Sequence, residues 1–282
     1  MQSLAKFAMR SPLHAIGVSV LAASLPLLAW LSASVVALVA LSQGFRAGAN
    51  VFLWTLIPMG IGFHYTSDPT SVTLVISVFL LALALRNRFS WEQVLVFASC
   101  ITLIGTFLFY NIASTVFDQL IDIYNQILPG TDGIPALEDK ELVKIMIAGY
   151  SVMFYFFSIA VLSLARWWQS CLYNPSGFGS EFHSLRLPPL VSIAAVLAVI
   201  FCLVFVDRLG IWAPFVGSPL FIAGLGLVHW TFEAAKISNF WLIGFYIGLF
   251  LFFQLFFPVL TSIAIIDSFF DLRSRFKFSN KE

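Results

Sequence analysis

The sequence predicts an all-α polytopic transmembrane bundle of eight or nine membrane helices, formed by one integral membrane domain over residues 1–282. Hydrophobic residues make up 60% of the chain and charged residues only 10%, whereas an average soluble domain is about 25% charged. The mean hydropathy is +0.95, and apolar stretches recur along the chain at about the length that crosses a bilayer. This composition excludes a water-soluble enzyme. The net charge of +1 removes any argument for nucleic-acid binding by bulk charge.

Eight apolar segments account for the predicted helices, because the hydrocarbon core of a bilayer takes about 20 residues of helix. The first segment is too long for one untilted span. It forms either one helix kinked at Pro26 or two short helices joined at Ser24–Pro26. It follows Lys6 and Arg10 without a convincing cleavage site, which indicates an uncleaved membrane segment. The last segment is similarly long and holds Pro258. In order, the segments cover residues 13–42, 47–64, 71–86, 92–112, 143–165, 188–206, 213–235 and 239–267.

The distribution of Lys and Arg predicts which ends of the helices face the cytoplasm. Arg166 and Arg186 bracket residues 166–187, which we expect to form a cytoplasmic loop. Residues 113–142 carry six acidic side chains against one Lys, which places them outside. Basic residues near both ends of the chain, including those of the tail 272–282, predict that both termini are cytoplasmic.

Nine full spans cannot place every loop and both termini on the sides of the membrane assigned above. We therefore expect one irregular segment, and residues 213–235 are the best candidate because Pro214, Pro219 and three glycines interrupt them. These residues form one span, two spans or a re-entrant loop. The alternative is that residues 13–42 form one tilted span and that the arginine rule fails at one loop.

The acidic segment 113–142 contains a predicted amphipathic helix. Its apolar residues recur with helical spacing opposite Asp118, Asp122 and Gln126. Such a helix lies on the outer surface or caps a cavity, and residues 129–133, with a Pro and two Gly, end it. The apolar face consists of Val116, Leu120, Ile121, Tyr124 and Ile127.

Local motifs for common enzyme classes are absent from the sequence. It contains no phosphate-binding GxxxxGK[ST], no zinc-protease HExxH and no GxSxG nucleophile elbow. Cys100, Cys171 and Cys202 are widely separated and form no Cys/His cluster, which argues against a disulfide framework or a zinc site. We therefore expect a non-enzymatic protein without a metal or cofactor.

Ionisable residues within apolar segments indicate candidate ligand-binding positions, because burying them in lipid is costly. His229, Glu233 and Lys236 can share one helix face by their spacing. This face either lines a polar cavity, where Glu233 binds a cation or a hydrogen-bond donor of a ligand, or sits at the headgroup boundary with Lys236 reaching into water. Asp267 is the fourth candidate, and it forms either a salt bridge to a neighbouring element or part of a proton relay.

Partner contacts are predicted at two places. Ala29, Ala33 and Ala37 have the four-residue spacing that permits close helix approach, either to a partner protein or within the bundle. The segment 166–187 is longer than a simple tether requires, and its side chains Glu181 and Arg186 are candidates for contacts with another protein.

Idiosyncratic stretches in the polar segments carry a resemblance that covers nearly the whole chain. The chain resembles the YybS-like family of bacterial multi-pass inner-membrane proteins, in the version found in Gram-negative bacteria. The resemblance implies an inner-membrane location with segment 113–142 in the periplasm. Because the family has no assigned function, it implies no catalytic residues. The stretches that carry it are residues 86–91, 166–169, 172–178, 181–187 and 266–275.

The family is in turn distantly similar to the substrate-binding S components of energy-coupling-factor transporters. Those proteins dock on a coupling subunit through small-residue helix motifs, which the row from Ala29 to Ala37 resembles. This chain is longer than a usual S component and adds the segment 113–142. The fold is thus expected to be S-component-like in part.

The leading functional hypothesis is a non-catalytic, transporter-like subunit that binds a small-molecule solute. It would depend on an energising membrane coupling protein, because the chain has no nucleotide site. The alternative is a structural or assembly scaffold of the cell envelope without a ligand. A membrane enzyme is a third hypothesis, and it requires Glu233, Asp267 and a histidine to converge in one pocket.

Overall fold

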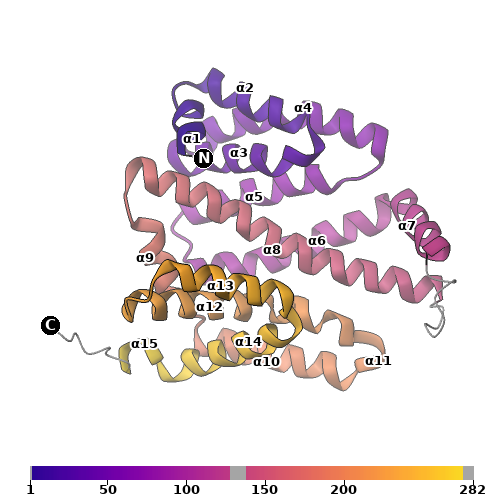
Figure 1. The fold of residues 1–282 in the computed structure, drawn as a ribbon. Coiled ribbons are helices and arrows are strands. Elements are labelled where there is room, and N and C mark those ends of the chain that lie inside the picture. The colour runs from indigo at the N-terminus through magenta and orange to yellow at the C-terminus, as the bar shows by residue number, and fades with distance from the viewer. Residues whose placement is uncertain (1, 128–137, 276–282) are drawn as a thin grey trace. The chain divides into compact units, whose positions relative to one another are not determined.

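The computed structural model describes residues 2–127 and 138–275, and these residues form helices without any strand. The predicted all-α class is confirmed. The chain divides into two compact units, each described here by itself (Figure 1). The first unit combines Met1–Phe89 with Phe97–Pro175, and the second combines Ser90–Val96 with Ser176–Glu282.

The first unit is built around one central helix, α3 (Ala29–Gln43), which packs against α2, α4, α5 and α8 (Figure 1). Eleven of its 15 residues are buried, as expected for a helix that is apolar on every side. The other helices of the unit are α1 (Gln2–Ala8), α2 (Pro12–Ala23), α4 (Phe45–Thr66), α5 (Thr70–Arg86), α6 (Trp91–Ile112, from Phe97 onward), α7 (Ser114–Ile127) and α8 (Asp139–Tyr173).

The first apolar segment is two helices rather than one. α2 ends at Ala23, a short 3₁₀ turn η1 covers Pro26–Leu28, and α3 begins at Ala29. The two helices pack against each other. Of the two interpretations of residues 13–42, the structure shows the pair of short helices joined near Ser24–Pro26.

Small residues on α3 and α4 allow neighbouring helices to pack closely against α3. Ala29, Ala33 and Ala37 are 6%, 0% and 0% exposed, so they pack within the bundle of the first unit. Gly48 of α4 shows how close the approach is, because a Cβ there would lie 2.8 Å from the Cα of Ala40. The structure thus places the alanine row among the chain's own helices and not on a surface open to a partner.

The predicted amphipathic helix is present as α7. It packs through Phe117, which is buried, and through Val116 onto Phe109 and Tyr150 of α6 and α8. Leu120 and Ile127 are exposed, so only part of the predicted apolar face makes contacts. The predicted end of the helix at residues 129–133 lies outside the described residues.

The segment predicted as a loop over residues 166–187 is mostly helical. α8 continues to Tyr173, and α9 (Gly177–Ser184) follows after a short turn. The reason is that nothing before Asn174 and Pro175 breaks the helix. Trp168, in the last turns of α8, is fully buried within the protein.

The second unit is built around α12 (Ala213–Ala234), which packs against α14, α10 and α9 (Figure 1). α13 (Asn239–Leu251) contacts α14, and Phe252 separates the two helices. The last apolar segment is therefore divided at Phe252, while Pro258 lies inside a helix. The remaining elements are α10 (Pro189–Val204), α11 (Val206–Leu209), η2 (Gly210–Trp212), α14 (Phe253–Phe270) and α15 (Leu272–Arg275).

The prediction that residues 213–235 are irregular is wrong, because α12 is continuous. Pro214 lies in the first turn, where no intrahelical N–H is needed. Pro219 is tolerated inside the helix. The glycines serve close packing and do not break the helix: a Cβ at Gly224 would lie 2.4 Å from the carbonyl oxygen of Leu260.

By length and composition, the described residues contain four helices that are able to cross a membrane, or five if the bent pair of α9 and α10 counts as one span. This supports a membrane protein, with fewer complete spans than the eight or nine predicted. The difference arises because several apolar segments form helices of only 12 to 17 residues, about 18–26 Å long. The four candidates are Trp91–Ile112, Asp139–Tyr173, Val206–Ala234 and Phe253–Phe270.

Candidate functional site

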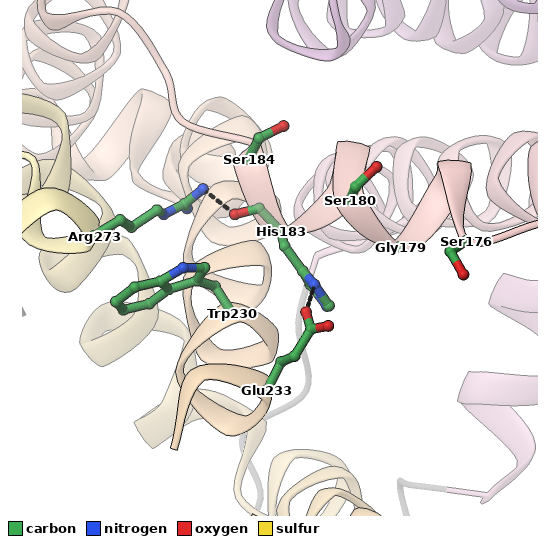
Figure 2. Close-up of a pocket in the computed structure, with 8 residues that line it drawn as sticks. All are labelled: Ser176, Gly179, Ser180, His183, Ser184, Trp230, Glu233 and Arg273. Carbon is green, nitrogen blue, oxygen red and sulfur yellow. Dashed lines mark hydrogen bonds and ion pairs between the residues drawn. The ribbon is translucent and has the colours of Figure 1, made fainter. Parts of the chain in front are cut away.

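A polar pocket of about 610 Å³ lies at one end of the second unit (Figure 2). Helix α9 forms one wall, and the C-terminal end of α12 and the short helix α15 complete it. Its size falls within the range of about 300–1,000 Å³ that is usual for ligand sites. The lining residues are Ser176, Gly179, Ser180, His183, Ser184, Trp230, Glu233 and Arg273.

The backbone of α9 lies directly on α12. α9 begins after Ser176, which has a left-handed φ of 71°, and it ends shortly before Pro188. Gly226 makes the contact possible, because a Cβ there would lie 2.9 Å from the carbonyl oxygen of Phe182. Leu185 is 1% exposed and anchors the residues after α9 in the core of the unit.

A buried ion pair fixes the C-terminal end of α14. Its C-cap, Asp271, has a left-handed φ of 48°, so the chain turns back. The N–H of Leu272 donates to Oδ1 of Asp267 at 2.9 Å, and Nε of Arg273 lies 3.3 Å from Oδ2. The side chains of Arg273 and Asp267 are 11% and 2% exposed.

The same Arg273 joins α15 to α9 through the backbone. Its Nη1 donates to the carbonyl of His183 at 2.5 Å, and its Nη2 donates to the carbonyl of Leu185 at 2.6 Å (Figure 2). Burial lowers the pKa of Arg273 and the charge of Asp267 opposes that shift; a guanidinium remains charged at neutral pH. Arg273 therefore holds the pocket wall in place through one donor of each terminal nitrogen.

His183 and Glu233 face each other across the pocket. Nδ1 of His183 contacts a carboxylate oxygen of Glu233, which joins α9 to α12 (Figure 2). The Glu233 side chain is 69% exposed, so its carboxylate remains accessible from the pocket. His229, one turn earlier on α12, is hydrogen-bonded through Nε2 to the Tyr246 hydroxyl at 2.6 Å.

The structure brings together only part of the predicted ligand-binding set. His229 and Glu233 share a face of α12, and Glu233 lines the pocket. Lys236 lies beyond the end of α12 with a left-handed φ of 53°, so it does not extend that face. Asp267 forms a salt bridge with Arg273, as in the first of its two predicted roles, a salt bridge to a neighbouring element. It does not line the pocket.

The two predicted partner-contact side chains interact within the second unit. Glu181 accepts a hydrogen bond from the indole N–H of Trp91 at 3.0 Å. Nη1 of Arg186 lies 3.0 Å from Oδ1 of Asp271. Both interactions connect elements that are far apart in sequence.

Sequence reasoning missed most of the pocket wall, above all His183, Arg273 and the three serines. The residues of α9 reach the pocket because α9 folds back onto α12 after the left-handed turn at Ser176. Arg273 reaches it because the chain turns back at Asp271. One signal was available in the sequence. Asp267 is an acid within an apolar run, and Arg273, six residues later, is a basic residue close enough in sequence to pair with it.

The pocket offers mainly hydrogen-bond acceptors to a ligand. The Ser180 and Ser184 hydroxyls donate to the carbonyls of Gly177 and Glu181, both at 2.9 Å, and so present their lone pairs outward. The accessible Glu233 carboxylate adds a negative charge. Among residues 2–127 and 138–275, no group of three His, Cys, Asp or Glu side chains is placed to hold a metal ion.

No protein-family model, curated protein or solved structure matches this chain. The resemblance to the YybS-like family therefore stays a prediction.

Proposed function

We propose that this chain is a non-catalytic, transporter-like membrane subunit that binds a small polar solute in the pocket of its second unit. The observation that carries the proposal is the pocket itself, which the His183–Glu233 pair lines together with three serines and the Trp230 side chain. A few convergent polar groups in a pocket of this size are typical of ligand sites. The solute would supply hydrogen-bond donors or a positive charge to Glu233.

A non-catalytic function is favoured by the way the polar groups are used. Nδ1 of His183 contacts Glu233, while the Ser180 and Ser184 hydroxyls donate along their own helix. A serine nucleophile would instead need to donate to the imidazole. Movement of the solute would require an energising partner, because the sequence contains no phosphate-binding loop.

The scaffold hypothesis receives less support from the geometry. It would act through Glu181 and Arg186, but Trp91 and Asp271 engage these side chains within the chain. The membrane-enzyme hypothesis requires Asp267 in the pocket, where Arg273 stands instead. Solute binding is thus the function that the site supports best.

We further propose that the pocket faces the cytoplasm of a bacterium from its inner membrane, with both termini on that side. Arg186, Lys236, Arg273 and Arg275 lie at or beyond the ends of α9, α12 and α14 nearest the pocket, and such basic residues mark the cytoplasmic side. The shorter apolar helices would enter the bilayer as partial spans and bring the number of membrane helices to eight or nine.

The two ends of the candidate span Val206–Ala234 are expected to react from opposite sides of the membrane. In a chain whose three cysteines are replaced by serine, Asp207→Cys should be labelled by a membrane-impermeant maleimide added outside, and Lys236→Cys only after the membrane is opened. Residues 206–234 would then cross the bilayer once. Labelling of both positions from the same side would contradict this topology.

Glu233→Gln is expected to abolish solute retention while leaving the protein folded. Native mass spectrometry of the gently extracted chain should show a discrete non-lipid adduct, reduced about tenfold or more in the variant, because a charged hydrogen-bond partner contributes about 1.5–3 kcal/mol. Asp207→Asn is the matched control, since it removes a charge outside the pocket. An adduct unchanged in Glu233→Gln would remove this residue from the site, and bare protein with a stoichiometric protein partner would favour the scaffold.

A further inference from the structure

A second polar cavity, of about 280 Å³, lies in the first unit between α1, α2, α3 and α4. Its floor is apolar and tightly built, because Ala8, Ala15, Val39 and Val51 are at most 2% exposed. The polar lining residues are Ser11, Gln43, Arg46 and Asn50. This cavity shares no residue with the pocket of the second unit.

Ser11, the first of these polar residues, is hydrogen-bonded to Nδ1 of His14 at 2.6 Å and accepts from its backbone N–H, whereas the other three polar side chains are exposed at the opening of the cavity. Among the described residues, the side chains of Arg46, Gln43 and Asn50 have no hydrogen bond or ion pair. Arg86 of the same unit, by contrast, donates to the carbonyl of Leu41 at 2.6 Å. A guanidinium and two amides at one opening, with no acid among the lining residues, match the oxygens of a phosphate-type anion.

The backbone also favours an anion in this cavity. The first turns of α2 and α4 both contribute lining residues, and the N-cap of α4 is Gly44, which has no side chain to cap the helix. The N–H groups at the start of α4 therefore leave a partial positive charge beside Arg46. No carboxylate in the cavity wall opposes it.

The surrounding surface is rich in basic residues. Gln169 and Arg86 both donate to the carbonyl of Leu41, so the ends of α3, α5 and α8 meet beside the start of α4. Lys6, Arg10, Arg46, Arg86 and Arg166 belong to this end of the unit. Basic clusters of this kind attract the anionic lipids of the cytoplasmic leaflet.

We propose that the cavity between α1, α2, α3 and α4 binds a phosphate-type oxyanion, with the Arg46 guanidinium and the amides of Gln43 and Asn50 as donors. The anion is either free phosphate or the phosphate of a lipid headgroup, since both present the same oxygens. This site is separate from the solute pocket and does not depend on it.

The test uses the full chain in two settings. In micelles of a maltoside detergent, which carries no phosphate, isothermal titration with inorganic phosphate measures free-anion binding. In nanodiscs of phosphatidylcholine that also contain phosphatidylglycerol, native mass spectrometry measures retained lipid. Arg46→Gln should weaken binding at least tenfold in whichever setting shows it, because an Arg–phosphate contact is charge-assisted. Asn50→Asp should do the same by placing a negative charge in the same volume.

Arg88→Gln is the matched control, because it removes the same charge from the first unit outside the cavity. If the wild type binds inorganic phosphate and both Arg46→Gln and Asn50→Asp lose that binding, the ligand is a free oxyanion. If the wild type retains phosphatidylglycerol and the same two variants lose it, the ligand is a lipid headgroup. Absence of binding in both settings, binding that survives Arg46→Gln and Asn50→Asp, or an equal loss in Arg88→Gln would overturn the proposal. Since Arg46 and Asn50 are exposed, neither change is expected to disturb folding.

Discussion

Replacing Arg273 with alanine is expected to lower the free energy of unfolding by about 3–5 kcal/mol. Arg273→Ala leaves the carboxylate of Asp267, which is 2% exposed, without its cation. It also removes the donors that satisfy the carbonyls of His183 and Leu185. An unpaired buried charge and two unsatisfied carbonyls each destabilise the folded state. Chemical or thermal unfolding of the detergent-solubilised chain measures the loss.

Arg275→Ala provides the matched control for this prediction. Arg275 is exposed, and its cation–π contact with Phe270, at 5.6 Å from the ring centroid, contributes about 0.5–1 kcal/mol. A double variant that removes both charges, Asp267→Asn with Arg273→Met, should lose less stability than the sum of its single variants. If Arg273→Ala and Arg275→Ala lose the same stability, Arg273 does not hold the pocket wall.

Much of the fold follows from the hydrophobic pattern, because a membrane helix needs a long apolar run and little else. The sequence leaves the break near Ser24–Pro26 as one of two open alternatives, whereas the all-α class and the amphipathic helix α7 could be predicted from local spacing. The number of complete spans could not, because hydropathy does not distinguish a helix facing lipid from a helix such as α3 that is enclosed by its neighbours.

The errors have a common physical cause, which is that tertiary contacts decide what a local signal means. Gly224 and Gly226 look like helix breakers in the sequence, but they admit the backbones of α14 and α9. The sequence could not show that Arg186, a predicted partner contact, also pairs with Asp271 across 85 residues of sequence. Glu233 could be identified as an ionisable residue in an apolar segment, whereas its partner His183 depends on the return of α9.

Replacing Gly224 with alanine is expected to lower the free energy of unfolding by about 1–3 kcal/mol, although alanine is the better helix former. The new Cβ would lie 2.4 Å from the carbonyl oxygen of Leu260 and 3.0 Å from its carbonyl carbon. These are backbone atoms of α14, so no side-chain rotation relieves the overlap. α12 and α14 must move apart, and the packing of buried Leu220 and Leu260 at their interface is lost.

Gly244→Ala distinguishes this steric effect from helix propensity. Nothing lies within 4 Å of a Cβ at Gly244, which is also inside a helix, so the same substitution there should stabilise the chain by up to about 1 kcal/mol. Unfolding curves measured in one detergent should show that the free energy of unfolding falls in Gly224→Ala and rises in Gly244→Ala, if α12 and α14 pack as described. Because α14 carries Asp267, Gly224→Ala should also weaken solute retention at the pocket without changing any residue of its wall. A stability gain in Gly224→Ala would mean that the two helices are not in contact at this position.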